Sequence, residues 1–351
     1  MSYTNGLDKP SEYFNTKLYT GSGSTQSITG VGFQPDWIWF KNRTDARAHA
    51  LVDFIRGTNK VLRSDSNVAE ATTTAGRDFE SFDSDGFTVN NPLAFNSFNE
   101  SGDNIVAWNW LASNTTASNT DGSITSTVSA NTTSGFSIVS YTGTGANATV
   151  GHGLSSAPKM IILKERNPTT TRNWRVYHED VGNNKVLYLD TTGAQVSDST
   201  AFNSTTPTSS VFSLGSSVGT NGNTKNYIAY CFSPKSGYSS MGKYTGNGST
   251  DGTFVYTGMR PAFIMIKRTD STGNWNTIDN KRLGRNPNNP RLYPNDSGAE
   301  DSADATTDIL SNGFKLRATS QYVNFSGGSY IYMAFAESPF TTSTGIPTTA
   351  R

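Results

Sequence analysis

The side chains that most often carry out catalysis are few in this sequence, and they form no recognised catalytic arrangement. The 351 residues include three histidines, His49, His152 and His178, and one cysteine, Cys231. Nucleophilic catalysis needs a serine or cysteine beside a positioned base, and no G-x-S-x-G motif is present. The histidines also fall at different places in the internal repeat described below. We therefore predict no catalytic site and no cofactor, and we expect Cys231, within an apolar run, to be a small buried residue.

Acidic residues gather at two places where a metal ion could bind. The first, Asp83 to Gly86, begins like a calcium loop but lacks the spaced ligands and closing glutamate of that motif, so a turn is favoured. The second lies in residues 299–310, where a short helix is expected, and contains Glu300, Asp301, Asp304 and Asp308. A solvated surface or a helix N-terminus explains this cluster better than a metal site does. No metal is predicted.

A glycine-rich motif, Tyr-Thr-Gly-x-Gly, begins at Tyr19, Tyr141 and Tyr244. A phosphate-binding loop would need a further glycine or a Gly-Lys-Ser/Thr ending, and neither is present. Because the motif recurs three times, it suits a structural turn better than a single cofactor site.

Two kinds of side chain remain as speculative ligand-binding groups. The basic pairs Lys41/Arg43 and Lys164/Arg166 are two residues apart, so each pair lies on one side of a strand end. They could contact phosphates or anionic sugars, although protection of a sheet edge is the favoured interpretation. Trp174 and Trp275 each follow an asparagine in a polar stretch, are expected to be exposed, and could stack on sugars.

These motifs belong to an internal repeat of three units. In each unit a proline follows the glycine-rich motif and precedes an apolar strand, and an aromatic strand closes the unit. The prolines are Pro35, Pro158 and Pro261, and the closing aromatic residues are Trp110, Phe232 and Phe335. Each landmark recurs after 122 or 123 residues and then after 103 residues. Four tryptophans align with apolar or aromatic residues of the second unit and are expected in the core: Trp37, Trp39, Trp108 and Trp110.

Short apolar runs bounded by Gly, Asn, Asp and Ser predict strands joined by turns. Residues 37–40 and 160–163 are continuously apolar, which indicates strands buried on both faces. We predict an all-β protein of three tandem antiparallel β-sandwich or jelly-roll-like domains of about 100 residues each. The expected segments are an N-terminal docking arm (1–18), β-domain 1 (19–112), a Ser/Thr/Asn-rich linker (113–134), β-domain 2 (135–237), β-domain 3 (238–340) and a C-terminal tail (341–351).

Composition excludes several classes of protein. The 28 basic and 28 acidic residues give zero net charge, which argues against a nucleic-acid binder. No apolar run approaches the ~20 residues that span a bilayer, so no membrane insertion is expected. The polar start predicts no Sec-type export and synthesis in a reducing cytoplasm. Aromatic residues make up 11% of the chain, which favours a folded protein over a disordered one.

Four elements of the first unit together resemble a known family. They are Tyr19 to Gly23, Gly32 to Arg43 (GFQPDWIWFKNR), Val52 to Gly57 (VDFIRG) and Asp85 to Phe87. This combination is similar to a repeated β-domain of marine bacteriophage virion proteins, which occurs in tail-fibre-like and other surface structural proteins and mainly has no assigned function. The resemblance covers the three units, although only Asp279 to Arg282 matches the D-x-I-R-G element outside unit one. The family supplies no catalytic residues.

The resemblance implies a non-enzymatic virion surface protein, assembled in the host cytoplasm. A tail-fibre or receptor-binding adhesin anchored by the N-terminal arm is the leading hypothesis. Its expected partners are other tail or capsid proteins, in a symmetric homo-oligomer, and a host-surface glycan or receptor. Two alternatives stay open: a capsid decoration or head-fibre protein, and a carbohydrate-binding module or depolymerase.

Overall fold

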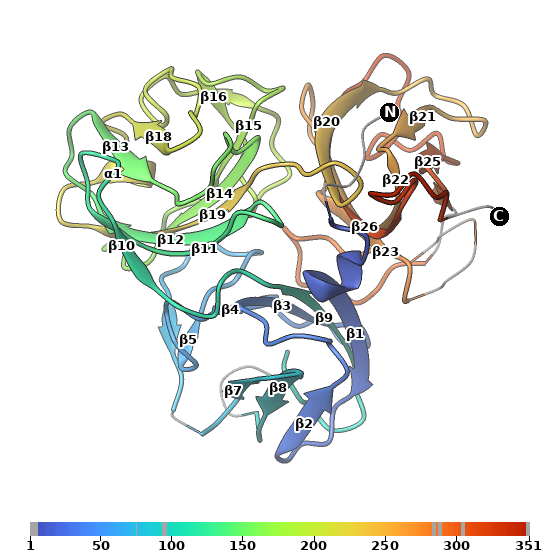
Figure 1. Cartoon of the computed structure of the whole chain (residues 1–351), viewed down its shortest axis with the longest axis horizontal. Coiled ribbons are helices and arrows are strands. Elements are labelled where there is room, and N and C mark those ends of the chain that lie inside the picture. Colours follow the sequence, from blue (N-terminus) through green and yellow to red (C-terminus); the bar gives the residue numbers. More distant parts are fainter. Residues whose placement is uncertain are drawn as a thin grey trace.

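The computed structural model describes residues 6–74, 76–92, 97–282, 286, 290–302 and 306–348, and it is all-β. Within these residues the helical segments are η1 (Pro10–Glu12) and α1 (Val218–Asn221). All pairs of named strands are antiparallel, so the predicted fold class is confirmed. Figure 1 shows three groups of strands arranged around a common centre, which we call units 1, 2 and 3.

The three units repeat one arrangement of strands, a four-strand set in a fixed order with a smaller sheet beside it. In unit 1 the main sheet is β1 (Phe14–Thr20), β9 (Asn104–Trp110), β3 (Trp37–Asn42) and β4 (Ala50–Asp53). The smaller sheet is β2 (Gln26–Thr29), β8 (Gly86–Val89) and β7 (Phe79–Asp83), and β5 (Lys60–Val61) pairs with β6 (Ala71–Thr72).

Units 2 and 3 follow the same plan with local differences. The main sheet of unit 2 has six strands, in the order β10 (Ala117–Asn119), β11 (Ser126–Asn131), β12 (Phe136–Thr142), β19 (Asn226–Phe232), β14 (Met160–Glu165) and β15 (Arg175–His178). Its small sheets pair β13 (Ala148–Gly151) with β18 (Val211–Leu214) and β16 (Lys185–Val186) with β17 (Val196–Ser197). Unit 3 has β20 (Ser239–Thr245), β26 (Ser329–Pro339), β22 (Met259–Arg268) and β23 (Asn276–Asp279), and its smaller sheet is β21 (Phe254–Tyr256), β25 (Gly313–Leu316) and β24 (Thr307–Leu310).

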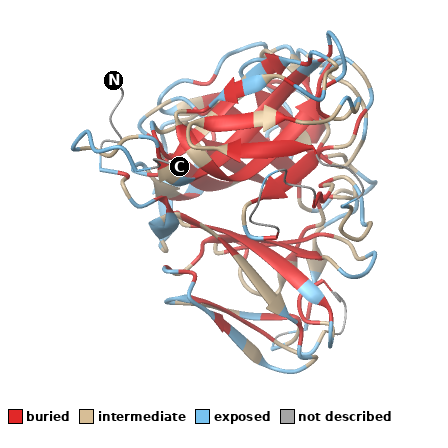
Figure 2. Cartoon of the chain, turned by 90° about the vertical axis from the view of Figure 1, so that its right-hand side faces the viewer, coloured by how far each residue is buried: buried red, intermediate tan, exposed pale blue. Residues whose placement is uncertain are grey.

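The central strands are buried on both faces, as their continuous apolar sequences predicted. On β3, Ile38 and Phe40 join a hydrophobic cluster that also contains residues of the smaller sheet of unit 1. Trp37 and Trp39 point the other way, because successive strand residues face opposite sides, and they belong to a second cluster. Buried strands and exposed turns are visible in Figure 2.

This second cluster is a core shared by all three units. Trp37 stacks on Tyr230 of unit 2 with ring centroids 4.3 Å apart. Phe232 of unit 2 contacts Phe335 of unit 3 at 5.9 Å, and Phe14 of unit 1 lies 5.2 Å from Phe335. The three units are therefore built around one aromatic core, which independent tandem domains would not have.

Several predicted segments are corrected by the strand assignments. Residues 113–134 are not a free linker, because they contribute β10 and β11 to the main sheet of unit 2. The described part of the arm, 6–18, is packed into the body: Leu7 and Phe14 are buried in the shared core. Ser343 of the tail donates its backbone N–H to Asp8 Oδ1 at 2.7 Å. The expected helix at 299–310 is wrong, since Thr307–Leu310 is strand β24, and Asp304 lies outside the described residues.

The Tyr-Thr-Gly-x-Gly motif forms a structural turn in each unit. In unit 1 the Tyr19 hydroxyl donates to the Phe98 carbonyl at 2.5 Å, and the buried Asn99 accepts the Ser22 N–H at 2.9 Å. Units 2 and 3 repeat these bonds with Tyr141 and Asn221, and with Tyr244 and Asn324. The motif therefore fixes the chain between two strands.

The first glycine of this turn is expected to tolerate no side chain. A Cβ atom at Gly21 would lie 2.1 Å from the Glu100 carbonyl oxygen, so Gly21→Ala should lower the free energy of unfolding by roughly 1–3 kcal/mol. Gly193→Ala is the control, because its nearest neighbour is the Thr191 hydroxyl at 3.4 Å. Urea unfolding followed by circular dichroism measures both, and equal stabilities of the two variants would contradict this role of the turn.

Candidate functional site at the interfaces between units

Five of the six residues proposed from the sequence as ligand-binding groups contact a neighbouring unit, and the sixth, Lys164, bonds within unit 2. Trp174 and Trp275 are buried, so the expectation that they are exposed is wrong. The Trp174 indole N–H donates to the Arg63 carbonyl of unit 1 at 2.8 Å, and that of Trp275 donates to the Tyr188 carbonyl of unit 2 at 2.9 Å. Both rings therefore hold neighbouring units together, and sugar stacking on them would need these contacts to open.

A histidine takes the corresponding place in unit 1. His49 directly precedes β4, as Trp174 directly precedes β15 and Trp275 directly precedes β23. The His49 Nε2 lies 3.0 Å from the Tyr293 carbonyl of unit 3. Burial lowers the pKa of His49 well below its usual value, and burial lowers the pKa of His178 to about 4. Neutral, buried imidazoles of this kind fit the structural role expected for the histidines.

Three equivalent lysines are also buried, and two of them bond across an interface. Lys41 donates to the Ser297 carbonyl of unit 3 at 3.1 Å, and Lys267 donates to the Thr192 carbonyl of unit 2 at 2.9 Å. Lys164 donates to the Arg172 carbonyl at 2.5 Å within its own unit. Burial lowers the pKa of Lys41 and of Lys164 to about 8, and that of Lys267 to about 7. Their ammonium groups face carbonyl oxygens inside the protein and are not presented to an external anion.

The buried Lys267 gives a testable pH dependence. Its pKa is about 7 in the folded protein against the ordinary value of 10.5, so between these pH values the unfolded chain binds more protons. Stability should therefore rise with pH from 7 to 9, by up to about 1.4 kcal/mol per pH unit for this group. Lys267→Met is expected to reduce this slope in urea unfolding at pH 7, 8 and 9. Lys9→Met, at a side chain that is 77% exposed, is the control, and equal slopes in both variants would contradict the assignment.

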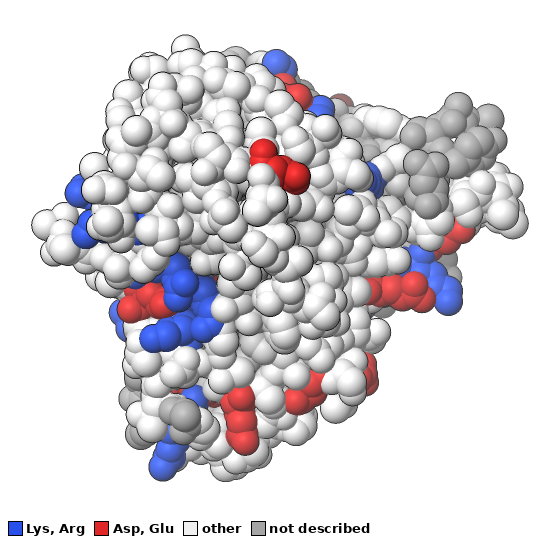
Figure 3. Space-filling model, turned by 60° about the vertical axis from the view of Figure 1, so that its left-hand side comes forward, with Lys and Arg blue, Asp and Glu red and all other residues white. Residues whose placement is uncertain are grey.

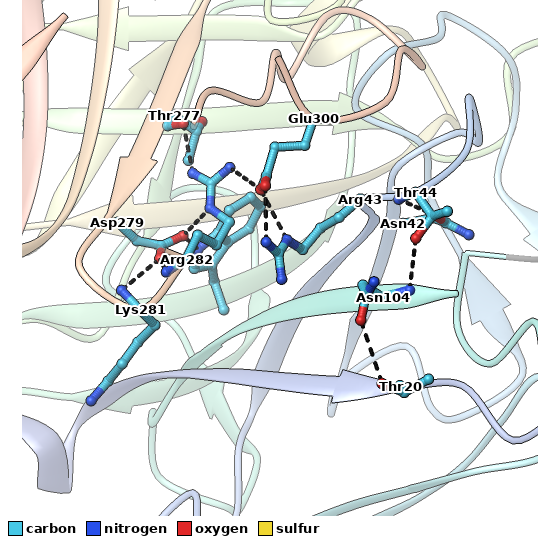
Figure 4. Close-up of polar contacts among 11 residues, drawn as sticks. Thr20, Asn42, Arg43, Thr44, Asn104, Thr277, Asp279, Lys281, Arg282 and Glu300 are labelled. Carbon is cyan, nitrogen blue, oxygen red and sulfur yellow. Dashed lines mark hydrogen bonds and ion pairs between the residues drawn. The ribbon is translucent and has the colours of Figure 1, made fainter. Parts of the chain in front are cut away.

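The remaining two predicted residues, Arg43 and Arg166, belong to buried ion-pair networks. At the interface of units 1 and 3, Glu300 accepts two hydrogen bonds of 2.9 Å from Arg43 and one of 3.1 Å from Arg282. Arg282 also donates to Asp279 at 2.7 Å, and the Trp108 indole donates to the same carboxylate at 3.0 Å. Figure 4 shows Arg43 and Arg282 converging on Glu300 from different units.

The interface of units 1 and 2 repeats this network with the equivalent residues. Glu70 accepts bonds of 2.9 Å from Arg166 and one of 3.2 Å from Arg56. Arg56 donates to Asp53 at 2.5 Å, and the Tyr230 hydroxyl donates to that carboxylate at 2.7 Å. The side chains of Asp53 and Arg56 are both 0% exposed. The Arg166–Glu70 pair and the Tyr230–Asp53 hydrogen bond link the two units, and the Arg56–Asp53 pair within unit 1 leaves neither of its buried charges without a partner.

Among the residues that the structure describes, the interface of units 2 and 3 lacks the Asp/Arg/Glu network, and an ion pair of 3.3 Å between Asp180 and Lys243 crosses it instead. Trp37, Met160 and Phe263 are equivalent positions on the central strands. Trp37 pairs with Asp53 and Phe263 pairs with Asp279, but Met160 pairs with His178, so a histidine replaces the aspartate in unit 2. Val181 then stands where the other units have Arg56 and Arg282. At the other two interfaces the backbone N–H of the glutamate donates to the backbone carbonyl of the arginine, from Glu70 to Arg166 and from Glu300 to Arg43. Here the backbone N–H of Gln195 donates to the Thr269 carbonyl in the same way. Gln195 and Thr269 therefore replace the glutamate and the arginine.

A cavity of about 270 Å³ opens at this interface. Both units supply polar side chains to its wall: Asp180, Lys185 and Gln195 from unit 2, and Lys243, Thr269 and Asp270 from unit 3. A second cavity of about 270 Å³ lies within unit 3 beside Tyr256 and Phe340. We regard the cavity between units 2 and 3 as the candidate site, because polar groups from two units converge there.

Sequence patterns alone did not reveal these residues. The D-x-x-R spacing shared by Asp53/Arg56 and Asp279/Arg282 was the one sign of these networks in the sequence. The glutamates that complete them, Glu70 and Glu300, also pair with arginines of a neighbouring unit, which are distant in sequence. Residues of the acidic cluster at 299–310 form ion pairs with arginines: Asp301 pairs with Arg291 at 2.6 Å, and Asp308 pairs with Arg317 at 2.5 Å. In the described part of the chain, no group of three or more His, Cys, Asp or Glu residues is placed to hold a metal ion.

Comparisons with known proteins give one match. A family model described as "Domain of unknown function (DUF7483)" matches residues 9–339, which span all three units. No curated protein and no solved structure matches the chain significantly. Among the described residues, no helix has the length and apolar character needed to cross a membrane.

Proposed function

Because the chain belongs to the family described as domain of unknown function DUF7483, whose description names no activity, we propose its function from the resemblance and the architecture together. The proposal is a non-enzymatic structural protein on the surface of a bacteriophage particle, acting as a tail-fibre or receptor-binding adhesin. Its location would be the virion, assembled in the host cytoplasm with other tail or capsid proteins as a symmetric homo-oligomer.

The observation that carries this proposal is the combination of one shared core with a surface of short polar turns. The core joins Trp37, Tyr230 and Phe335 from three units, which suits a component that must hold its shape outside a cell. The face drawn in Figure 3 is mostly uncharged, and its charged side chains lie in small scattered groups of both signs. Such a surface offers hydroxyl and amide groups to a receptor without attracting nucleic acid.

Labelling of purified phage particles tests the proposal. An antibody raised against the chain, viewed by electron microscopy with gold particles, should mark the tail or its fibres, and mass spectrometry should find the chain in the same particles. Labelling confined to the capsid would overturn the adhesin role in favour of the decoration or head-fibre alternative. Particles that contain none of the chain would overturn the virion proposal altogether.

A further inference from the structure

We infer that the cavity between units 2 and 3 is a binding site for a neutral saccharide unit of about the size of a hexose. This inference goes beyond a structural role and depends on the proposed adhesin function for its biological meaning. The binding itself is a property of the isolated protein and can be tested without particles.

The first argument is the contrast between equivalent interfaces. Two interfaces are filled by a glutamate that bonds arginines from both units, at Glu300 and at Glu70. At the third, Gln195 and Thr269 take the places of glutamate and arginine, and a cavity of about 270 Å³ lies there. The cavity is thus lined by the two residues that stand where the other two interfaces have a bonded glutamate and arginine.

The second argument is the set of polar groups left available in the cavity. Within the described residues, the Lys185 ammonium and the Gln195 side-chain amide make no hydrogen bond or ion pair. Asp180 and Lys243 form an ion pair of 3.3 Å in which the side chains are 23% and 69% exposed, so each retains further bonding capacity. The wall therefore presents ammonium and amide donors together with carboxylate and amide acceptors.

The balance of these groups selects the class of ligand. Both carboxylates of the wall are already paired, Asp180 with Lys243 at 3.3 Å and Asp270 with Arg268 at 2.8 Å, so hydrogen-bonding groups decide the ligand more than net charge does. Each hydroxyl of a sugar both donates and accepts, so it can use both kinds of partner. Val181 and Ile331 also line the cavity and, at 8% and 3% exposure, add a small apolar area for the C–H face of a sugar ring. The volume is below the usual range for larger ligands, ~300–1,000 Å³, which restricts the occupant to a small unit.

Saturation-transfer NMR and titration calorimetry on the full chain test this site. The probes are methyl glycosides of neutral hexoses and their disaccharides, with inorganic phosphate and a sialoside as charged comparisons. At least one neutral glycoside should bind, and neither charged probe should bind more tightly. Lys185→Ala should weaken binding about tenfold, since it removes one charged hydrogen-bond donor. Lys60→Ala is the matched control. Lys60 lies in unit 1 and pairs with Thr72 across β5 and β6, as Lys185 pairs with Ser197 across β16 and β17 in unit 2.

A second variant tests the site by filling it. Gln195→Glu combined with Thr269→Arg introduces the pair found at the other two interfaces, and it should abolish glycoside binding while the thermal midpoint is kept or raised. Tyr256→Ala, beside the other cavity, should leave binding unchanged. The inference is overturned if no neutral glycoside binds, if a charged probe binds more tightly, or if the filled variant binds normally. Absence of binding by a chain that is present on phage tails would refute this site alone.

Discussion

Replacing Trp37 with alanine should lower the free energy of unfolding by about 3–5 kcal/mol, one of the two largest effects expected for a single substitution in this protein. The Trp37 side chain is 0% exposed and lies against rings from two units, with centroids 4.4 Å from Trp110 and 4.3 Å from Tyr230. Its removal leaves a cavity in the shared core, and neighbouring rings held on two different sheets can refill that space only partly.

Urea unfolding monitored by circular dichroism measures this loss. Tyr256→Ala is the matched control, because that aromatic ring is 63% exposed and its truncation should change stability by less than about 0.5 kcal/mol. A Trp37→Ala variant as stable as the control would contradict the existence of a core shared between units.

Replacing Arg56 with methionine should cost about 3–5 kcal/mol, because the carboxylate of Asp53 would remain buried without its charged partner. Arg56 also bonds Glu70 at 3.2 Å and the Leu51 carbonyl at 2.9 Å, and Glu70 pairs with Arg166 of unit 2, so the substitution weakens the network that links the two units. Arg260→Met is the control: its pair with Glu337 is 33% and 40% exposed, and such surface pairs contribute about 0–1 kcal/mol.

The double variant Asp53→Asn/Arg56→Met distinguishes pairing from a general loss of packing. Removing both charges should cost less than the sum of the two single substitutions, because no charge is then left unpaired. Strict additivity of the two single effects would show that the pair does not act as a unit.

The sequence predicted the local structure well and the relation between units poorly. The continuous apolar runs at 37–40 and 160–163 indicated strands buried on both faces, and both faces are buried. A strand's sequence does not say what covers each face, so the contact of Trp37 with Tyr230 of another unit was not foreseen. The same limit explains Trp174, whose polar neighbours suggested exposure although its indole bonds a carbonyl of unit 1.

Composition misled the interpretation of residues 113–134. Ser, Thr and Asn are common in flexible connectors, but β10 and β11 pair through backbone groups, and such pairing depends little on side-chain type. Val128 and Ile124 supply the buried apolar side chains of this layer, and Ser126 and Ser129 are buried beside them. Because a sheet with hydroxyl-rich strands and an extended linker have similar compositions, the sequence alone could not separate them.

The departure of the interface of units 2 and 3 from the shared network was also hidden from sequence inspection. His178, Val181 and Gln195 look unrelated to the Asp, Arg and Glu of the other units until strand register aligns them. The insertions between the repeats differ in length, so the equivalence depends on the structure. The candidate site is thus found where the repeat departs from its own pattern.

Differential scanning calorimetry of the full chain tests most directly the claim that three repeats form one body. We expect a single transition whose calorimetric enthalpy equals its van't Hoff enthalpy, because the units share the core around Trp37, Tyr230 and Phe335. Two or three separable transitions, or a calorimetric enthalpy that is a multiple of the van't Hoff value, would show that the units unfold independently and would contradict the account.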